Sequence, residues 1–184
     1  MDKDGNEVKG ARCGTPHPSR PLPEDQMIQE MIAEGQVEGT GGAISTFFHV
    51  MCNDDGSNCA ATEQMIGEQV NVLNLAFAPT FSFVHKDTKY TNNSVWNSDG
   101  LNYEEEMKST LSVDPATTLN VYVVESIPNN VLGYAFLPNQ YPEDNSMHGI
   151  VMRGGTFPGG ANAPYNLGDT LVHEAGHYLG MSCQ

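Results

Sequence analysis

The hydrophobic and polar positions of this chain predict strands and helices that alternate along the sequence. Residues 43–51 are rich in β-branched and aromatic side chains and are typical of a strand. Between residues 61 and 76, apolar side chains recur every three or four positions, which predicts a helix with Thr62 as its N-cap and Pro79 after its end. Apolar and polar positions then alternate over residues 81–85, so we expect a second strand there.

The second half of the chain continues the same order. Residues 103–111 form a short acidic segment that predicts a helix, and we expect its three glutamates to face solvent. Residues 118–124 are mostly apolar, which indicates a central strand covered on both faces. Shorter extended segments are expected at 133–137 and 148–153, and a run rich in glycine and proline at 154–164 leads into a last helix.

This order predicts an α+β domain whose arrangement is close to α/β. Strands separated by helices favour a mostly parallel sheet with right-handed crossovers. Residues 1–35 combine a charged arm rich in glycine and proline with an apolar helical stripe at 24–34, and we expect them to form an arm and helix that resemble a pro-segment. Residues 36–184 are then expected to form the main domain.

The net charge of the chain is strongly negative. Over 184 residues, 8 Lys and Arg stand against 23 Asp and Glu, so the formal net charge is −15. Such a surface repels nucleic acid and anionic membranes, and we therefore expect neither as a partner. No apolar run is long enough to span a bilayer. The sequence carries no indication of an oligomeric state.

The residues with the clearest chemistry are His173-Glu174-x-x-His177, near the end of the chain. Side chains four positions apart lie on the same face of a helix, so the two imidazoles can point at one zinc ion, Zn2+, at about 2.0–2.1 Å each. Zinc lowers the pKa of a bound water toward about 7, and the neighbouring Glu174 can then take its proton. The pattern is the zinc protease motif, and it predicts zinc-dependent hydrolysis of peptide bonds.

The position of the third metal ligand differs from the extended form of this motif. Gly180 follows His177 by three residues, where a left-handed glycine can end the helix and turn the chain back toward the metal. The extended motif then has a third histidine, whereas this chain has Cys183 and ends at Gln184. Cys183 is either a thiolate ligand of the zinc or an unpaired cysteine. We favour a truncated sequence, with a C-terminal subdomain missing.

Two further cysteines bracket a polar loop. Cys52 and Cys59 flank the turn-rich residues 53–58, so they form either a local disulfide or two free thiols. A disulfide would imply an oxidising compartment, and we expect an extracellular, secreted protein, although the N-terminus carries no signal peptide. The loop is acidic, but it lacks the spacing of a calcium-binding loop, so Ca2+ is unsupported.

Cys13 belongs to the N-terminal arm, in the sequence Arg-Cys-Gly-Thr-Pro at residues 12–16. A thiolate on such an arm can reach the open position of a zinc ion and keep an enzyme latent. The local sequence resembles the cysteine switch of matrix metalloproteases. A disulfide that anchors the arm is the alternative role for Cys13.

Most of the chain, from residue 12 to Gly180, resembles the pappalysin-type metzincin metalloproteases, in particular their small secreted microbial and fungal members. The resemblance rests on His-Glu-Ala-Gly-His-Tyr-Leu-Gly at residues 173–180 and on the segment that leads to it from residue 164. It also includes Leu-Gly-Tyr-Ala at residues 132–135. Because these sequence segments lie far apart along the chain, the resemblance concerns the domain and not the metal motif alone.

The resemblance implies that His173 and His177 bind zinc and that Glu174 acts as general base and acid. It implies a twisted, mostly parallel sheet with one antiparallel edge strand, backing helices and an active-site helix. Peptide or protein substrates would lie along that edge, which we expect at residues 148–153. The residues of the edge would be Gly149, Ile150, Val151 and Met152.

Members of the family cleave internal peptide bonds in extracellular proteins, so the resemblance implies a zinc endopeptidase whose catalytic domain is residues 36–184. The alternative is a truncated or inactive protease-like module that binds peptides without turnover. The cysteine at the third ligand position, Cys183, motivates this alternative.

Overall fold

The computed structural model describes residues 41–181, and these form five strands and four α-helices. The strands are β1 (Ala43–Cys52), β2 (Ser82–Asn92), β3 (Thr118–Val124), β4 (Gly133–Ala135) and β5 (Ile150–Arg153). The helices are α2 (Glu63–Phe77), α3 (Ser94–Ser98), α4 (Glu104–Leu111) and α5 (Asp169–Tyr178). This order agrees with the sequence prediction, except that α3 is absent from the prediction and β2 is longer than expected.

The five strands belong to one sheet, in the order β2-β1-β3-β5-β4. β1 pairs in parallel with both β2 and β3, and β3 pairs in parallel with β5. Of these strands only β4 runs antiparallel, and it pairs with β5 at the edge of the sheet. The prediction of a mostly parallel sheet with one antiparallel edge strand is therefore confirmed.

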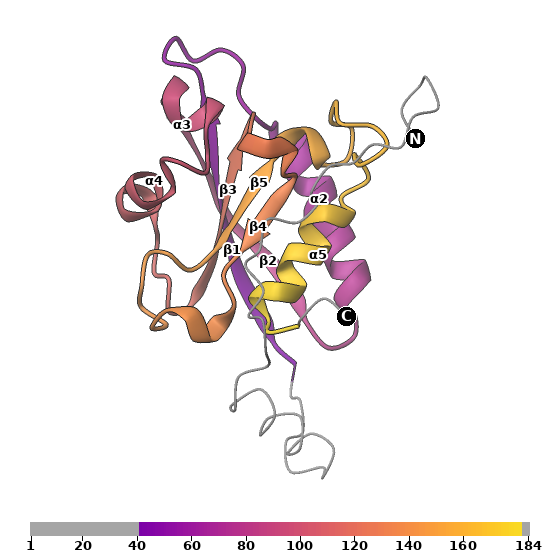
Figure 1. Ribbon diagram of the computed structural model, residues 1–184. Helices are drawn as coiled ribbons and strands as arrows, with labels where there is room; N and C mark the ends of the chain where they lie inside the picture. Colours follow the sequence, from indigo (N-terminus) through magenta and orange to yellow (C-terminus); the bar gives the residue numbers. More distant parts are fainter. Residues whose placement is uncertain (1–40, 182–184) are drawn as a thin grey trace.

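Helices cover both faces of the sheet, so the domain has three layers (Figure 1). α2 and α5 pack on one face, around a core that includes Phe48 and Leu171. α3 and α4 pack on the other face, around a core that includes Trp96 and Met107. Every residue of β3 is buried, because this strand lies in the middle of the sheet between the two helical layers. The expected central strand is confirmed.

The expected position of residues 149–152 at the edge of the sheet is wrong. Ile150, Val151 and Met152 belong to β5, which pairs with β3 on one side and with β4 on the other. Gly149, just before β5, is also enclosed, because a Cβ at this residue would collide with the carbonyl oxygen of Asn120. The chain reaches the edge of the sheet first with β4 and then returns to the interior with β5. The edge strand is therefore β4.

One of the three glutamates of α4 also differs from its expected position. Glu105 and Glu106 are exposed as expected, but Glu104 is buried and pairs with Lys108 at 2.7 Å. Helical spacing places both partners on the face that also carries the buried Met107. That apolar stripe is the signal in the sequence that could have revealed the burial of the pair.

A disulfide joins Cys52, at the end of β1, to Cys59, which confirms the local pairing. It closes the loop at residues 53–58. In that loop the amide of Asp54 donates a hydrogen bond to Ser94 Oγ at 2.8 Å, and the amide of Ser94 donates one to Asp54 Oδ1 at 2.9 Å. The disulfide and these two bonds hold the loop against the start of α3.

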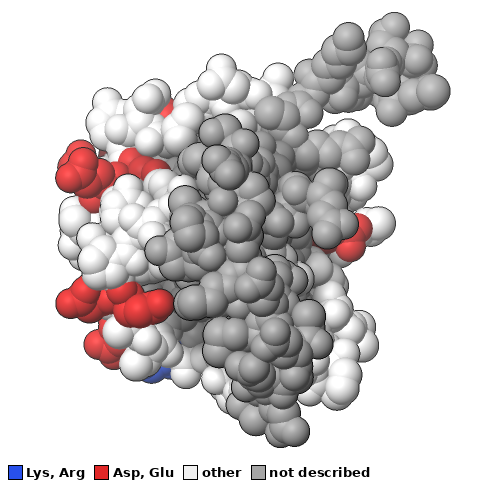
Figure 2. Space-filling model, turned by 60° about the horizontal axis from the view of Figure 1, so that its bottom comes forward, with Lys and Arg blue, Asp and Glu red and all other residues white. Residues whose placement is uncertain are grey.

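The charged surface is mostly acidic on the side of α3 and α4. Figure 2 shows Asp and Glu side chains gathered along this side of the molecule, with little positive charge among them. The exposed acidic residues there include Glu105 and Glu106 on α4. A surface of this kind attracts cations and cationic peptides and repels polyanions.

Several expectations concern residues outside the described range. They are the helix at 24–34, the boundary between residues 35 and 36, Cys13 and Cys183. Within residues 41–181, no helix is both long enough and apolar enough to cross a membrane.

Candidate active site

The helix α5 carries all three residues of the zinc protease motif, and a side chain from α2 fixes its start. The residue before the helix, Gly168, has φ = 92° and provides no capping side chain. The fully buried Gln69 of α2 donates a hydrogen bond from Nε2 to the carbonyl oxygen of Gly168 at 3.0 Å. Sequence reasoning missed Gln69, because a contact over 99 positions leaves no local pattern.

The two imidazoles of the motif face each other along α5. His173 Nε2 and His177 Nε2 lie 3.1 Å apart, and the ring planes are perpendicular. A zinc ion at about 2.0–2.1 Å from both atoms would have an angle of about 100° between them, which is close to tetrahedral. Two nitrogen lone pairs at this distance repel each other unless a proton or a metal cation lies between them. The pair therefore fits zinc.

The turn after α5 sets the tautomer of His177. The imidazole Nδ1 lies 2.8 Å from the carbonyl oxygen of Met181. A carbonyl oxygen only accepts hydrogen bonds, so Nδ1 carries the hydrogen, and Nε2 of the neutral ring presents its lone pair. The carbonyl is positioned by a Schellman motif: the amide of Gly180 donates to His177 O at 2.9 Å, and the amide of Met181 donates to Gly176 O at 2.8 Å.

The glycine of this turn adopts the conformation that the sequence predicts. Gly180 has φ = 89°, in the left-handed region that disfavours side chains, and α5 ends at Tyr178. The chain therefore turns back at the end of the helix.

Glu174 lies beneath the edge strand. Its side chain is fully buried, and a Cβ placed on Gly133 of β4 would lie 3.2 Å from Glu174 Cγ and 2.5 Å from Met152 Sδ. A larger residue at position 133 would therefore push the strand away from α5. Because position 133 is glycine, the backbone of the edge strand passes directly over the glutamate.

Two candidate metal ligands of this site, His173 and His177, lie within the described residues. Within residues 41–181, no group of three or more His, Cys, Asp or Glu side chains could hold a metal ion together. Structural and catalytic zinc sites have at least three protein ligands. Cys183, two positions beyond Met181, lies outside the described range.

His49 and His85, two further histidines of the described range, have contacts away from the metal motif. His49 is fully buried, its Nε2 lies 2.9 Å from Asn120 Oδ1, and its ring stacks on Tyr122. Burial lowers its pKa to about 4, so the ring is neutral at pH 7. His85 Nε2 lies 2.9 Å from Thr88 Oγ1 on the exposed strand β2. The expectation that His49 and His85 are structural agrees with these contacts.

The sequence is similar to extracellular metalloproteases of fungi over nearly its whole length. It is 34% identical to an extracellular metalloprotease of Pyricularia oryzae over 92% of this chain and 63% of that protein. It is 36% identical to one of Sordaria macrospora over 95% of this chain and 64% of that protein. The chain thus spans less than two thirds of the length of these curated relatives. No protein-family model matches it.

Solved structures of metalloproteases share the fold. A variant of promirolysin from Tannerella forsythia superposes with a TM-score of 0.65 at 20% identity, over 92% of this chain and 68% of that chain. Mirolysin in complex with a small compound gives 0.64 at 22% identity, over 77% of this chain and 64% of that chain. The sheet order and the helical layers described above are therefore those of a metalloprotease fold.

Proposed function

We propose that this chain is the zinc-binding part of an extracellular endopeptidase of the pappalysin type. One observation carries the proposal: His173 Nε2 and His177 Nε2 lie 3.1 Å apart, next to a fully buried glutamate on the same helix. The similarity to extracellular metalloproteases supports the same conclusion. The disulfide between Cys52 and Cys59 supports an oxidising environment outside the cell.

His173 and His177 would hold the zinc ion through their Nε2 atoms. Zinc supplies Lewis acidity at such a site: it polarises a peptide carbonyl and makes water acidic enough to lose a proton near neutral pH. The hydrogen bond from His177 Nδ1 to Met181 O keeps that imidazole in the tautomer whose Nε2 lone pair can point at a metal. Binding of the metal therefore requires no rearrangement of this ring.

Glu174 would move the proton. Its carboxylate lies one residue after the first histidine, and it can accept a proton from the attacking water and deliver it to the nitrogen of the leaving amine. The strand β4 covers Glu174 at Gly133. A substrate that lies along β4 would therefore have its backbone near this carboxylate.

The substrate would bind as an added strand along β4. An extended peptide can continue a sheet by hydrogen bonding to the backbone of an edge strand. Among the described strands, β4 occupies one end of the sheet and pairs only with β5. The proposed edge is thus Gly133–Ala135, in place of residues 149–152.

The first test is Glu174→Gln, with the exposed Glu105→Gln as the matched control. We expect Glu174→Gln to keep its zinc and to lose cleavage of a denatured protein by about 10²–10⁴-fold. The control, which makes the same chemical change at the surface of α4, should cleave like the parent chain. Undiminished cleavage by purified Glu174→Gln would contradict the proposal.

The cysteines outside the described range complete the proposal. We propose Cys183 as the third ligand and Cys13 as a ligand that keeps the protein latent, with residues 1–35 acting as a pro-segment-like arm before the catalytic domain at 36–184. Zinc affinity should fall in Cys183→Ala. Cleavage should rise in Cys13→Ala without a fall in zinc content. If neither variant differs from the parent chain, both assignments are wrong.

A second candidate function is a module that binds peptides without turnover. It is favoured by the finding that residues 41–181 provide only two ligands for the metal. This candidate predicts that the zinc-loaded chain binds an extended peptide and leaves it intact. Cleavage that disappears in Glu174→Gln would exclude it.

A further inference from the structure

A lysine is completely buried on the side of the sheet opposite α5. The side chain of Lys108 on α4 has no exposed surface, and its Nζ lies 2.7 Å from Glu104 Oε1. Burial lowers the pKa of Lys108, and the charge of Glu104 opposes this shift. Because replacing a buried ion pair by apolar residues is often neutral for stability, burial of the pair calls for an explanation beyond stability.

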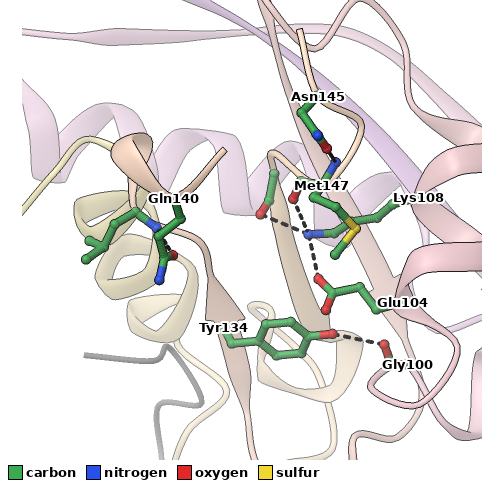
Figure 3. A network of polar contacts seen from close by, with 9 residues as sticks. Gly100, Glu104, Lys108, Tyr134, Gln140, Asn145 and Met147 are labelled. Carbon is green, nitrogen blue, oxygen red and sulfur yellow. Dashed lines mark hydrogen bonds and ion pairs between the residues drawn. The ribbon is translucent and has the colours of Figure 1, made fainter. Parts of the chain in front are cut away.

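The ammonium group contacts both ends of one connection. Lys108 Nζ donates hydrogen bonds to the carbonyl oxygens of Met147, at 2.8 Å, and Gly149, at 3.4 Å (Figure 3). It also lies 5.1 Å from the centre of the Phe136 ring, within the range of a cation–π contact. Phe136 directly follows β4, and Gly149 directly precedes β5. One cation therefore ties together the two ends of residues 136–149, here called the β4–β5 connection.

The same network reaches the edge strand itself. Tyr134, in the middle of β4, points toward α4, and its hydroxyl donates a hydrogen bond to the carbonyl oxygen of Gly100 at 2.9 Å (Figure 3). Burial raises the pKa of Tyr134, and the nearby charge of Glu104 raises it further. On the opposite face of β4, Gly133 lies against Glu174. The strand β4 thus contacts Glu174 of the candidate active site on its α5 side and the buried network on its α4 side.

The β4–β5 connection also reaches the far end of α5. A Cβ on Gly180 would lie 3.8 Å from Pro138 Cγ. Since the turn at Gly180 positions the carbonyl that orients His177, the connection lies between the buried lysine and the proposed metal site.

We propose that Lys108, with Glu104, is a positioning residue for peptide binding: it holds β4 and the β4–β5 connection in the geometry that receives an extended substrate. The inference rests on the proposed function, since it takes β4 as the edge for a peptide. Neither side chain reaches the cleft side of the sheet, so they act through the backbone of β4 and of residues 136–149. The alternative is an ion pair that contributes to stability alone.

The test uses the full chain with a double variant that leaves no buried charge. Glu104→Gln together with Lys108→Met removes both charges, so it avoids the unpaired carboxylate that Lys108→Met alone would leave. Lys86→Met is the matched control, because Lys86 is half-exposed on β2 and pairs only loosely with Asp114, at 3.8 Å. Thermal unfolding and zinc content identify variants that remain folded and loaded.

Two readouts separate positioning from stability. In the folded double variant we expect hydrogen exchange to rise in residues 133–149 and to stay unchanged in β1 and β3. We also expect KM for an extended peptide to rise by about tenfold, with kcat nearly unchanged, because the groups that move the proton are not altered. The control should change neither quantity.

Peptide affinity measured in the Glu174→Gln background makes the test independent of turnover. A double variant with parental hydrogen exchange, parental KM and parental peptide affinity would overturn the inference and leave the proposed function intact. A parent chain that binds peptide without cleaving it would overturn the proposed function, and the affinity of the double variant would still decide the role of Lys108. A parent chain that neither cleaves nor binds peptide would overturn both.

Discussion

The two faces of the sheet carry polar groups in opposite arrangements. On the α4 face, the cation of Lys108 is surrounded by a carboxylate and two carbonyl oxygens, so its charge is compensated by the protein itself. On the α5 face, two imidazole nitrogens that both favour a cation lie 3.1 Å apart. The first arrangement is complete as it stands, whereas the second is suited to a metal. The difference is that the charge of Lys108 already has partners in the protein, whereas the two imidazole nitrogens are arranged to share a cation.

The strongest test of this comparison removes one of the facing nitrogens. We expect His177→Ala to abolish tight zinc binding and to lower peptide cleavage by at least about 10³-fold. Zinc content by atomic absorption and cleavage of a denatured protein measure the two effects. His85→Ala is the control, since His85 is an exposed histidine of β2 whose ring nitrogen contacts Thr88. Equal zinc loss in both variants would contradict the assignment.

On the α4 face, removing one charge of the buried ion pair should reduce stability. Lys108→Met leaves the carboxylate of Glu104 buried without its cation, and we expect a loss of about 3–5 kcal/mol in the free energy of unfolding. The double variant with Glu104→Gln should lose clearly less, because no charge stays buried. Urea unfolding of both variants measures the difference. If the double variant loses as much as the single one, the charges are not the cause.

The buried imidazole of the α4 face should make stability depend on pH. His49 has a pKa lowered from 6.5 to about 4, mainly by burial, so the unfolded chain binds a proton more readily than the folded one. Its contribution is fully present above pH 6.5 and is lost as the pH falls toward 4. The loss should reach about 3 kcal/mol.

Urea unfolding at a series of pH values measures this loss. In His49→Gln the part of the pH dependence between 6.5 and 4 should flatten. A parental slope in His49→Gln would assign the pH dependence to other groups.

The smallest effect concerns the contact between the edge strand and the glutamate. Gly133→Ala places a methyl group 2.5 Å from Met152 Sδ and 3.2 Å from Glu174 Cγ, so we expect a loss of about 1–3 kcal/mol in stability together with weaker cleavage. Gly67→Ala in α2 is the control, because a Cβ there meets no atom within 4 Å. The control should stabilise the helix by about 0.5–1 kcal/mol.

Much of the fold follows from local patterns. The alternation of strands and helices was visible because each segment carries its own hydrophobic period. The N-cap Thr62 and the left-handed Gly180 are properties of a few neighbouring residues, and both take the predicted roles. The helix α3 escaped prediction, since its five residues begin with a cap at Asn93 and are too few to establish a period.

The identity of the edge strand shows where local patterns fail. The strand β4 has three residues, too few for an alternation of apolar and polar side chains to be recognised. Residues 148–153 form a longer apolar segment that is typical of a strand. Both segments look extended in the sequence. Which of them lies at the edge depends on the order of strands across the sheet, and that order is set by pairing between β3 and β5.

The sequence by itself determined the residues whose partners are close along the chain. His173 and His177 share one helical face with Glu174 beside the first of them, and this relation follows from spacing alone. Spacing also placed Cys52 and Cys59 within reach of each other, and the structure decided that they form a disulfide. Only the tertiary structure decided that β4 covers Glu174, that Gln69 holds the start of α5 and that Lys108 joins the two ends of the β4–β5 connection. These contacts join segments tens of residues apart, and the packing of layers on a sheet determines them.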